Sequence, residues 1–215
     1  MKKIAVVLSG CGFKDGTEIT ESICTLIALS QKGVQYKIFA PNIEFKSKNH
    51  LNGHIEGVRN VLVESARIAR GEIQDLTELR ASDFDAIVFP GGYGAAIHLC
   101  DWAEKGHHCA VHPEAERVIK EFNADSCPIG AICIAPALIA RVLGHKNITL
   151  TIGNDKETAQ EIAATGAIHE NCAVDDFITD RENKIISTPA YMYPAKPAEV
   201  FKGISGLINE LVEMA

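Results

Sequence analysis

The thiol of Cys133 is the side chain in this sequence best placed for covalent chemistry. It stands in residues 128–140, PIGAICIAPALIA, where an apolar run turns through small residues directly into a second apolar run. This pattern is typical of a nucleophile elbow, in which a tight strand-to-helix turn exposes the nucleophile at the edge of a sheet. The N–H groups and dipole of the following helix are expected to lower the pKa of the thiol. On position alone, a buried core cysteine is an equally good interpretation.

A pair of glycines, Gly91 and Gly92, follows another apolar run, FDAIVFP. Glycines directly after a buried strand leave backbone N–H groups free to face a ligand, and with the N–H of Ile134 they predict an oxyanion site. The alternative is a simple tight turn. The stretch GGYGAA imitates a phosphate-binding loop but lacks the Lys-Ser/Thr ending, so nucleotide binding is not expected.

Two acidic residues, Glu18 and Glu21, stand at the start of a helical pattern that Gly33 closes. Acidic side chains at a helix N-terminus interact favourably with the helix dipole, and this alone accounts for them. The functional interpretation is a carboxyl group facing Cys133, which hydrogen-bonds the thiolate when protonated and shuttles a proton when ionised. Cys11, in the loop before this helix, is a further candidate for ligand contact or oxidation.

These groups need a sheet that brings their loops together. Continuous apolar runs predict strands buried on both faces of a parallel sheet, at residues 3–8, 34–41, 84–92 and 127–135. Apolar residues at helical spacing predict helices at residues 19–33, 58–71, 113–122, 135–144, 155–166 and 198–213. Strands that alternate with helices predict an α/β fold, with a doubly wound, mainly parallel sheet and helices on both faces. Residues 173–188 add a small antiparallel hairpin.

In such a sheet, ligands collect at the carboxyl ends of the strands. Three unusual loops follow predicted strands, and we expect them to meet at one edge: residues 9–21, 90–96 and 132–137.

The composition restricts the domain organisation and the partners. The chain has 215 residues, 47% of them apolar, and no Pro/Ser/Gly-rich linker, so a single domain over residues 1–215 is expected. The net charge of −7 argues against binding to nucleic acid or an anionic membrane. The apolar run IAVVL near the start is too short for a signal peptide. Seven widely spaced cysteines suit free thiols in a reducing compartment and predict a cytoplasmic protein.

The segment 98–112, HLCDWAEKGHHCAVH, contains four histidines and two cysteines. His108 and His112 are four residues apart, so metal binding is an alternative, but no Cys-x-x-Cys pair or recognised zinc finger is present. We expect a surface excursion without a metal. The other thiols, of Cys24, Cys127 and Cys172, are interpreted as core or surface residues.

Together the motifs resemble the ThiJ/PfpI superfamily, relatives of the class I glutamine amidotransferases with a flavodoxin-like sheet. The nearer resemblance is to the enhancing lycopene biosynthesis proteins, the ElbB-like glyoxalase subfamily. It is carried, in the expected order, by SGCGFKDGTEITE, RNVLVESARIARGEI, FPGGYGAA, ICIAPA, LTIG and STPAYM. The resemblance implies that Cys133 is the nucleophile and that Gly91, Gly92 and Ile134 supply the oxyanion site.

The resemblance also implies a glutamate on the first helix. Glu21 stands twelve residues before Gly33 and Glu18 fifteen, and the superfamily carries its acid at the shorter spacing. Glu21 is therefore the expected partner of the thiol, with Glu18 as the alternative.

The chain departs from the superfamily at Ile134, where many members have a histidine directly after the nucleophile. A Cys-His dyad and the protease activity linked to it are therefore not expected. Glutaminases carry a His-x-Glu motif downstream of the cysteine, whereas here HPE at 112–114 is upstream and His169 and Glu170 are adjacent. The sequence contains no recognisable glutaminase triad.

The activity implied by the resemblance is a cofactor-independent conversion of glyoxal, and less readily methylglyoxal, to the 2-hydroxy acid. Metal, glutathione and nucleotide are not expected. The expected partners are a small aldehyde substrate and a second copy of the chain in a homodimer. Two alternatives stay open: a redox or stress sensor in which Cys133 is oxidised without turnover, and an amidotransferase-like accessory protein of isoprenoid biosynthesis.

Overall fold

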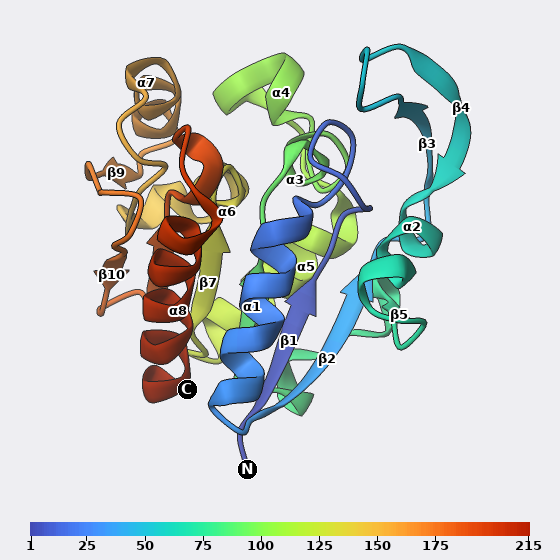
Figure 1. Cartoon of the computed structure of the whole chain (residues 1–215). Helices are drawn as coiled ribbons and strands as arrows, with labels where there is room; N and C mark the ends of the chain where they lie inside the picture. The colour runs from blue at the N-terminus through green and yellow to red at the C-terminus, as the bar shows by residue number, and fades with distance from the viewer.

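The computed structural model, which describes residues 1–215, is built on a seven-stranded sheet (Figure 1). Its strand order is β10–β11–β7–β6–β1–β2–β5, and every neighbouring pair is parallel except β10 and β11. The strands are β1 (Lys3–Val7), β2 (Gln35–Ala40), β5 (Gln74–Asp75), β6 (Ala86–Phe89), β7 (Ile129–Ile132), β10 (Ile178–Asp180) and β11 (Ile185–Thr188). The predicted α/β fold and the predicted antiparallel hairpin are both confirmed.

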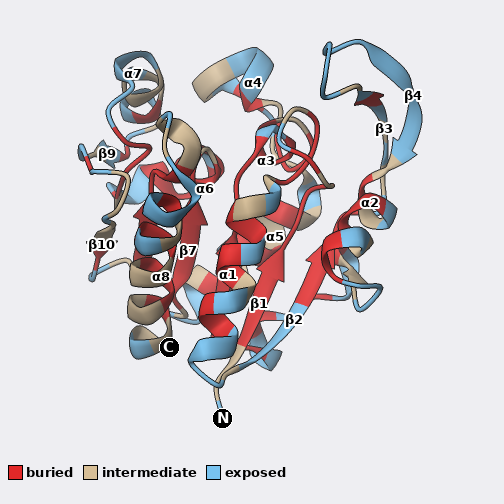
Figure 2. Ribbon diagram, viewed as in Figure 1, coloured by how far each residue is buried: buried red, intermediate tan, exposed pale blue.

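Two apolar layers cover the sheet. Along β1, Ile4 and Val6 pack on one face with the apolar stripes of α1, α2 and α8, while Ala5 and Val7 pack on the other face with α3, α5 and α6. Figure 2 shows the central strands as continuously buried. Continuous apolar runs were needed for this because both faces of a parallel sheet are covered. The helices are α1 (Ile19–Gln31), α2 (Val61–Ile68), α3 (Tyr93–Ile97), α4 (Trp102–Lys105), α5 (Pro113–Ala124), α6 (Ala135–Leu143), α7 (Lys156–Ala164) and α8 (Pro197–Met214).

The region before α2 corrects the predicted helix at residues 58–71. Residues 58–60 belong to β4 (Ile55–Asn60), which pairs with β3 (Glu44–Lys48) in a separate antiparallel hairpin. Asn60 is extended, with φ −114° and ψ 132°, and its side chain accepts a hydrogen bond from the N–H of Val63 at 3.1 Å. This cap fixes the helix start at Val61, so the helix cannot extend backward. Figures 1 and 2 show the hairpin as an exposed arm beside the sheet.

The strand predicted at residues 34–41 is buried only in its second half. Residues 35–37 of β2 are exposed, because β2 lies near the edge of the sheet and pairs on its outer side only with the short β5. A second small sheet, β8 (Thr149–Leu150) with β9 (Ile168–His169), was not predicted. No helix in the chain is both long and apolar enough to cross a membrane.

The sheet topology determines where a ligand would bind. From β1 the chain runs outward to β2 and β5, then returns to the opposite side of β1 and continues through β6, β7 and β11. The direction of winding therefore reverses between β1 and β6, which is the position where doubly wound sheets form a crevice. The loops after β1, β6 and β7 all leave the sheet at this edge.

Candidate active site

Cys133 occupies the turn between the end of β7 at Ile132 and the start of α6 at Ala135. Its φ is 62°, a left-handed conformation that is uncommon for a residue other than glycine and stores strain. The turn is held because the N–H of Cys133 donates to the carbonyl of Thr188, at the end of β11, at 2.9 Å. The side chain is 7% exposed. Burial alone fits a core cysteine, but a core cysteine has no need of a strained backbone.

The partner of the thiol is Glu21, in the first turn of α1 and fully buried. One carboxylate oxygen accepts the N–H of Gly91 at 3.0 Å, the other accepts the N–H of Tyr191 at 3.3 Å, and the thiol of Cys133 lies beside the same carboxyl. A Cβ at Gly91 would lie 2.5 Å from the Cβ of Cys133 and 2.8 Å from Oε2 of Glu21. Glycine is therefore required for the pair to meet.

The acid and the thiol both hold their protons more tightly than usual. Burial, reinforced by the negative charge of Glu18, raises the pKa of Glu21 to about 8. Burial also raises the pKa of the Cys133 thiol well above its usual value, and the nearby Glu21 carboxyl adds to the effect. The predicted lowering of the thiol pKa is therefore wrong in direction, because desolvation outweighs the helix N-terminus. The pair is uncharged at neutral pH and loses its first proton near pH 8.

Two backbone N–H groups, those of Gly92 and Ile134, face the sulfur of Cys133 and oppose the rise in its pKa. Gly92 has a φ of 91°, and a Cβ there would lie 2.4 Å from the backbone nitrogen of Glu18. Gly91 was also predicted as an oxyanion donor. Its N–H is used by Glu21, so its role is to position the acid rather than to face a substrate oxygen.

The other candidates lie close by without touching the thiol. Glu18 caps α1, its carboxylate accepting the N–H of Glu21 at 2.7 Å, and it lines the cavity described below. Cys11 is half-buried and is not among the residues that line this cavity. Burial raises the pKa of the Cys11 thiol, and the carboxylate of Glu64 adds to the shift.

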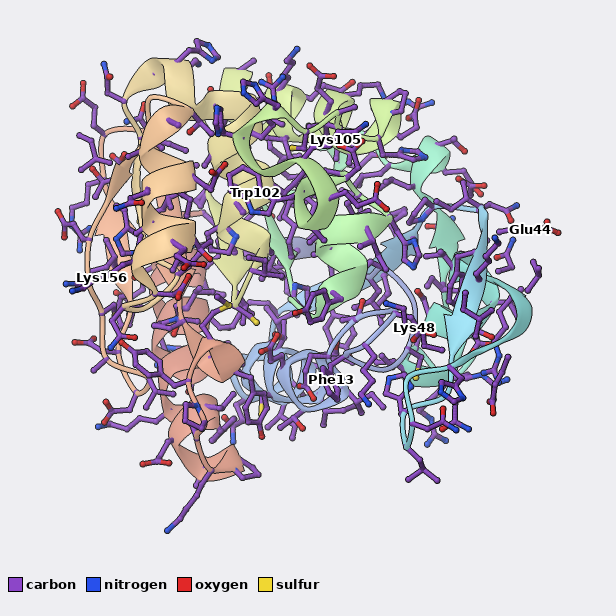
Figure 3. The ribbon with its side chains drawn as sticks, turned by 90° about the horizontal axis from the view of Figure 1, so that it is seen from above. Phe13, Glu44, Lys48, Trp102, Lys105 and Lys156 are labelled. Atoms are coloured by element: carbon purple, nitrogen blue, oxygen red, sulfur yellow. The ribbon has the colours of Figure 1, made fainter.

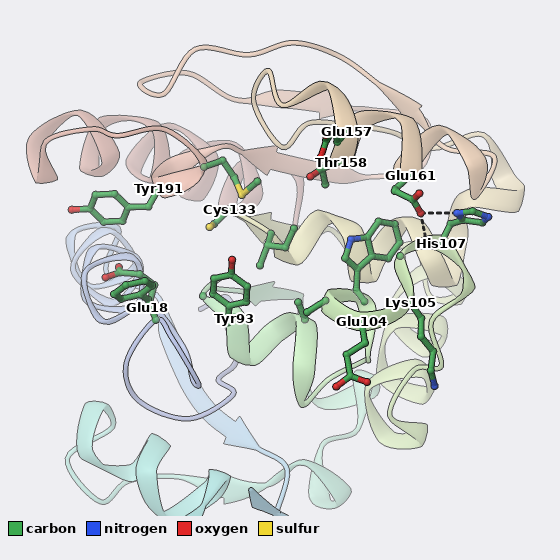
Figure 4. A pocket seen from close by; sticks show the side chains of 18 of the residues that line it. Glu18, Tyr93, Glu104, Lys105, His107, Cys133, Glu157, Thr158, Glu161 and Tyr191 are labelled. Carbon is green, nitrogen blue, oxygen red and sulfur yellow. Dashed lines mark hydrogen bonds and ion pairs between the residues drawn. The ribbon is translucent and has the colours of Figure 1, made fainter. Parts of the chain in front are cut away.

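A cavity of about 1000 Å³ opens beside Cys133. Figure 4 shows Cys133 at one side, between Tyr93 and Tyr191, and the contact of His107 with Glu161 at the other. Part of the wall comes from α3, within the predicted loop at residues 90–96, and the rest from elements that the sequence did not connect with the site: α4, α7 and the turn at 190–192. Tyr93, directly after the glycine pair, and Tyr191, in STPAYM, were the available signals. Figure 3, seen from above, labels three residues that line the cavity: Phe13, Trp102 and Lys105.

His107, His112 and His169 make contacts away from the Cys133 thiol. His107 Nδ1 lies 2.6 Å from Oε2 of Glu161, and His112 caps α5 by accepting the N–H of Glu114 at 3.2 Å. His169 accepts the N–H of Ile152 at 3.3 Å. No group of three or more His, Cys, Asp or Glu side chains is arranged to hold a metal ion. The side chain that acts most strongly on the Cys133 thiol is the carboxyl group of Glu21.

Comparison with known proteins identifies the family, although no family model matches the sequence. The rat protein named ES1 protein homolog, mitochondrial, is 40% identical over 227 residues, which cover 99% of this chain and 84% of the rat protein. The human protein named glutamine amidotransferase-like class 1 domain-containing protein 3, mitochondrial, is 41% identical, covering 99% of this chain and 83% of the human protein. The chain belongs to the ES1 family of glutamine amidotransferase-like class 1 proteins.

Solved structures of other proteins share the fold of this ES1-family chain. The crystal structure of an isoprenoid biosynthesis protein with amidotransferase-like domain from Ehrlichia chaffeensis is 35% identical, with a TM-score of 0.94 over 100% of this chain and 99% of that one. A ThiJ/PfpI domain protein from Brachyspira murdochii is 14% identical, with a TM-score of 0.62 over 99% of this chain and 98% of that one, and shows a shared fold. The predicted amidotransferase-like relationship is therefore confirmed, and the fold is shared with a ThiJ/PfpI domain protein.

Proposed function

We propose that this chain is a cofactor-independent glyoxalase-type enzyme of the ElbB-like kind, converting glyoxal or methylglyoxal to the 2-hydroxy acid. The proposal is carried by one observation: the strained Cys133 thiol contacts the buried acid Glu21 and is faced by two N–H groups beside a cavity. A thiol nucleophile, an acid that keeps its proton at neutral pH and two N–H donors supply the groups needed for addition and proton transfer at a carbonyl.

The first step is addition of the Cys133 sulfur to an aldehyde carbon. The C–S bond forms, the carbonyl bond opens onto its oxygen, and the N–H groups of Gly92 and Ile134 stabilise the negative charge that develops there. The thiol loses its proton and the oxygen gains one, with Glu21 relaying the proton between them. The product is a hemithioacetal. Because the thiol is protonated at neutral pH, this relay is required for the sulfur to attack.

The second step moves a proton between the two substrate carbons. Glu21 gives its proton to the second carbonyl oxygen, and the resulting carboxylate removes the proton from the carbon that carries sulfur, which forms an enediol. Glu21 then gives this proton to the neighbouring carbon and takes up the proton of the hydroxyl on the carbon that carries sulfur. The hemithioacetal thereby becomes the thioester of the 2-hydroxy acid. Water then adds to the thioester carbonyl, the C–S bond breaks, and glycolate or lactate leaves as the thiol is restored. One water is consumed, and no external oxidant or reductant is needed.

Tyr93 supplies a hydroxyl on the opposite side of the substrate position. It is the first residue of α3, its side chain is 55% exposed, and Figure 4 shows its hydroxyl directed toward Cys133. We assign it to hydrogen bonding of the second carbonyl oxygen. This role suits a chain in which Ile134 replaces the histidine that many superfamily members have beside the nucleophile.

The test is steady-state turnover of glyoxal and methylglyoxal by wild type, Cys133→Ala and Glu21→Gln. We expect Cys133→Ala to abolish formation of glycolate and lactate and Glu21→Gln to lower it at least about 100-fold. Cys127→Ala is the matched control, because Cys127 lies outside the cavity lining, and it should keep wild-type rates. Full activity in Cys133→Ala refutes the mechanism.

A redox sensor is the second candidate, favoured by the same geometry. A sulfinate on Cys133 would be stabilised by a protonated Glu21 and by the N–H groups of Gly92 and Ile134. Mass spectrometry after mild peroxide treatment separates the two functions. Selective oxidation of Cys133 without any aldehyde turnover supports the sensor.

An accessory role in isoprenoid biosynthesis is the third candidate, suggested by the name of the Ehrlichia chaffeensis protein. Release of ammonia from glutamine would support an amidotransferase. The lack of a histidine at the Cys133 thiol argues against it, because a glutaminase needs a base beside its nucleophile.

A homodimer and a cytoplasmic location also belong to the proposal. The seven cysteines are all free thiols, which suits a reducing compartment, whereas the rat and human relatives carry the word mitochondrial in their names. Light scattering of the purified chain tests the dimer, and fractionation of the source cells tests the location.

A further inference from the structure

The segment 98–112 contains a second pair of thiols, apart from the Cys133 site. This segment was predicted to be a surface excursion, which is wrong for its two cysteines: Cys100 is 5% exposed and Cys109 is 1% exposed. Both belong to the apolar cluster on the α5–α6 face of the sheet. Trp102 between them is also buried, at 6% exposed, whereas Glu104, Lys105 and His108 are exposed.

The backbone brings the two cysteines together. Cys100 forms an antiparallel bridge with Val111, and the N–H of Asp101 donates to the carbonyl of Ala110 at 3.1 Å. Cys109 is two residues from Val111, so in antiparallel pairing its side chain lies on the same face as that of Cys100, as a diagonal neighbour. Diagonal neighbours lie about 7–8 Å apart, slightly beyond the usual span of a disulfide, so the bond requires a small movement of the backbone.

The two thiols lie close enough to influence each other: the interaction lowers the pKa of Cys109 and raises that of Cys100. The thiol of Cys100 also donates to the carbonyl of Ala95 at 3.4 Å. The positive charge of Arg141, whose Nε donates to the carbonyl of Cys109 at 2.8 Å, lowers the pKa of Cys109 further. The pair therefore consists of a thiol inclined to ionise beside one that stays protonated, which is the arrangement of an attacking and a resolving cysteine.

The residues between the two cysteines form one wall of the cavity. Residues 102–108 line it without interruption. The far end of this wall is fastened to α7, because the N–H and the ring of His107 both contact Glu161, at 2.8 and 2.6 Å. Cys100 and Cys109 flank the two ends of residues 102–108, which we call the base of the wall. No covalent bond joins these ends while both thiols are free.

We propose that Cys100 and Cys109 are a redox modification site, whose reversible disulfide fastens the base of the 102–108 wall beside the Cys133 cavity. This inference is independent of the aldehyde chemistry proposed for Cys133. It assigns a modification to a segment whose cysteines and histidines form no metal site.

The chemistry needs a two-electron oxidant of the peroxide class. The Cys109 thiolate attacks a peroxide oxygen, the O–O bond breaks, and a sulfenic acid and hydroxide form. The Cys100 sulfur then attacks the sulfenic sulfur, the S–S bond forms and water leaves with the Cys100 proton. Overall two thiols lose two hydrogen atoms and hydrogen peroxide becomes two waters. A dithiol reductant reverses the change.

The first test is peptide mapping of the wild-type chain after mild hydrogen peroxide treatment, with free thiols blocked. We expect one cross-linked peptide pair joining Cys100 to Cys109, which disappears on treatment with dithiothreitol. Cys100→Ser and Cys109→Ser should each lose it, whereas the control Cys127→Ser should keep it. Separate blocking of both cysteines, under conditions in which other thiols of the chain are oxidised, overturns the proposal, and this result needs no variant to fold.

The second test asks whether the bond fastens the wall. Hydrogen exchange of the amides in residues 101–110 should slow at least about tenfold in the oxidised chain relative to the reduced one, because the disulfide restricts local opening. Amides of α8, far from the pair, provide the internal control and should be unchanged. A cross-link that forms without slowing this exchange overturns the fastening. Neither measurement depends on aldehyde turnover, so failure here is distinguishable from failure of the glyoxalase proposal.

Discussion

The buried carboxyl of Glu21 makes the stability of this protein depend on pH in an unusual direction. Its pKa is raised to about 8 in the folded chain, from 4.5 for a solvated glutamate. Between these values the folded chain keeps a proton that the unfolded chain has lost. Folding therefore becomes less favourable as the pH rises through this window. Glu21→Gln removes the titration while preserving the size of the side chain.

The magnitude follows from the same shift. Each unit of pKa difference corresponds to about 1.4 kcal/mol. For a shift from 4.5 to about 8, the wild-type chain should lose about 3 kcal/mol of its free energy of unfolding between pH 6 and pH 9 because of Glu21. Glu21→Gln should not lose this free energy of unfolding, because its side chain does not titrate. At pH 6 the variant is expected to be the less stable protein by about 1–3 kcal/mol, because its amide N–H₂ faces the N–H of Gly91 or Tyr191.

The assay is urea unfolding followed by circular dichroism at pH 6 and pH 9, for wild type, Glu21→Gln and the control Glu157→Gln on the exposed surface of α7. Other titrating groups are common to all three proteins and cancel in the comparison. We expect the difference between wild type and Glu21→Gln to change by about 3 kcal/mol in favour of the variant as the pH rises. If the three proteins lose stability in parallel, Glu21 is ionised in the folded chain and the reasoning about the site is refuted.

Three further changes test neighbouring parts of the argument. Gly91→Ala would place a Cβ 2.5 Å from that of Cys133, so the thiol and Glu21 must move apart and aldehyde turnover should fall about 100-fold, as measured by lactate formation. Tyr93→Phe should lower kcat/KM for methylglyoxal about tenfold without changing the unfolding midpoint; an unchanged kcat/KM removes the hydroxyl from the mechanism. Because burial raises the pKa of the Cys133 thiol, its alkylation by iodoacetamide should be slow at pH 7 and accelerate above pH 8, as followed by mass spectrometry; a rate already maximal at pH 7 contradicts that direction.

The elbow and its acid were predictable because they depend on local rules. A buried run that ends at Cys133 before a helix, and an acid at the start of a helix after the first strand, both point to the same edge of a parallel sheet. The contacts that hold Cys133 and Glu21 in place were not predictable from the sequence. It comes from Thr188 and Tyr191, on either side of a left-handed Ala190 with φ 44°, and their position depends on β11 lying beside β7.

Two other predictions were wrong because they also depend on tertiary contacts. The thiol pKa was assigned the wrong direction because a sequence shows the helix that follows Cys133 but not how completely the sulfur is buried beside an acid. The cysteines of the segment 98–112 were placed on the surface because their polar neighbours dominate the composition. Only the packing of the folded chain shows that both cysteines join the apolar cluster on the α5–α6 face of the sheet.

The two thiol sites should respond to peroxide in a fixed order, and that order distinguishes the functions considered for Cys133. The reactive species is the thiolate. Burial beside Glu21 keeps the Cys133 thiol protonated, whereas the interaction with Cys100 and the charge of Arg141 favour ionisation of Cys109. A limiting amount of peroxide should therefore join Cys100 to Cys109 before it oxidises Cys133, as a time course of peptide mapping would show. Oxidation of Cys133 first would instead favour the sensor, because it would mean that the elbow activates its sulfur without a substrate present.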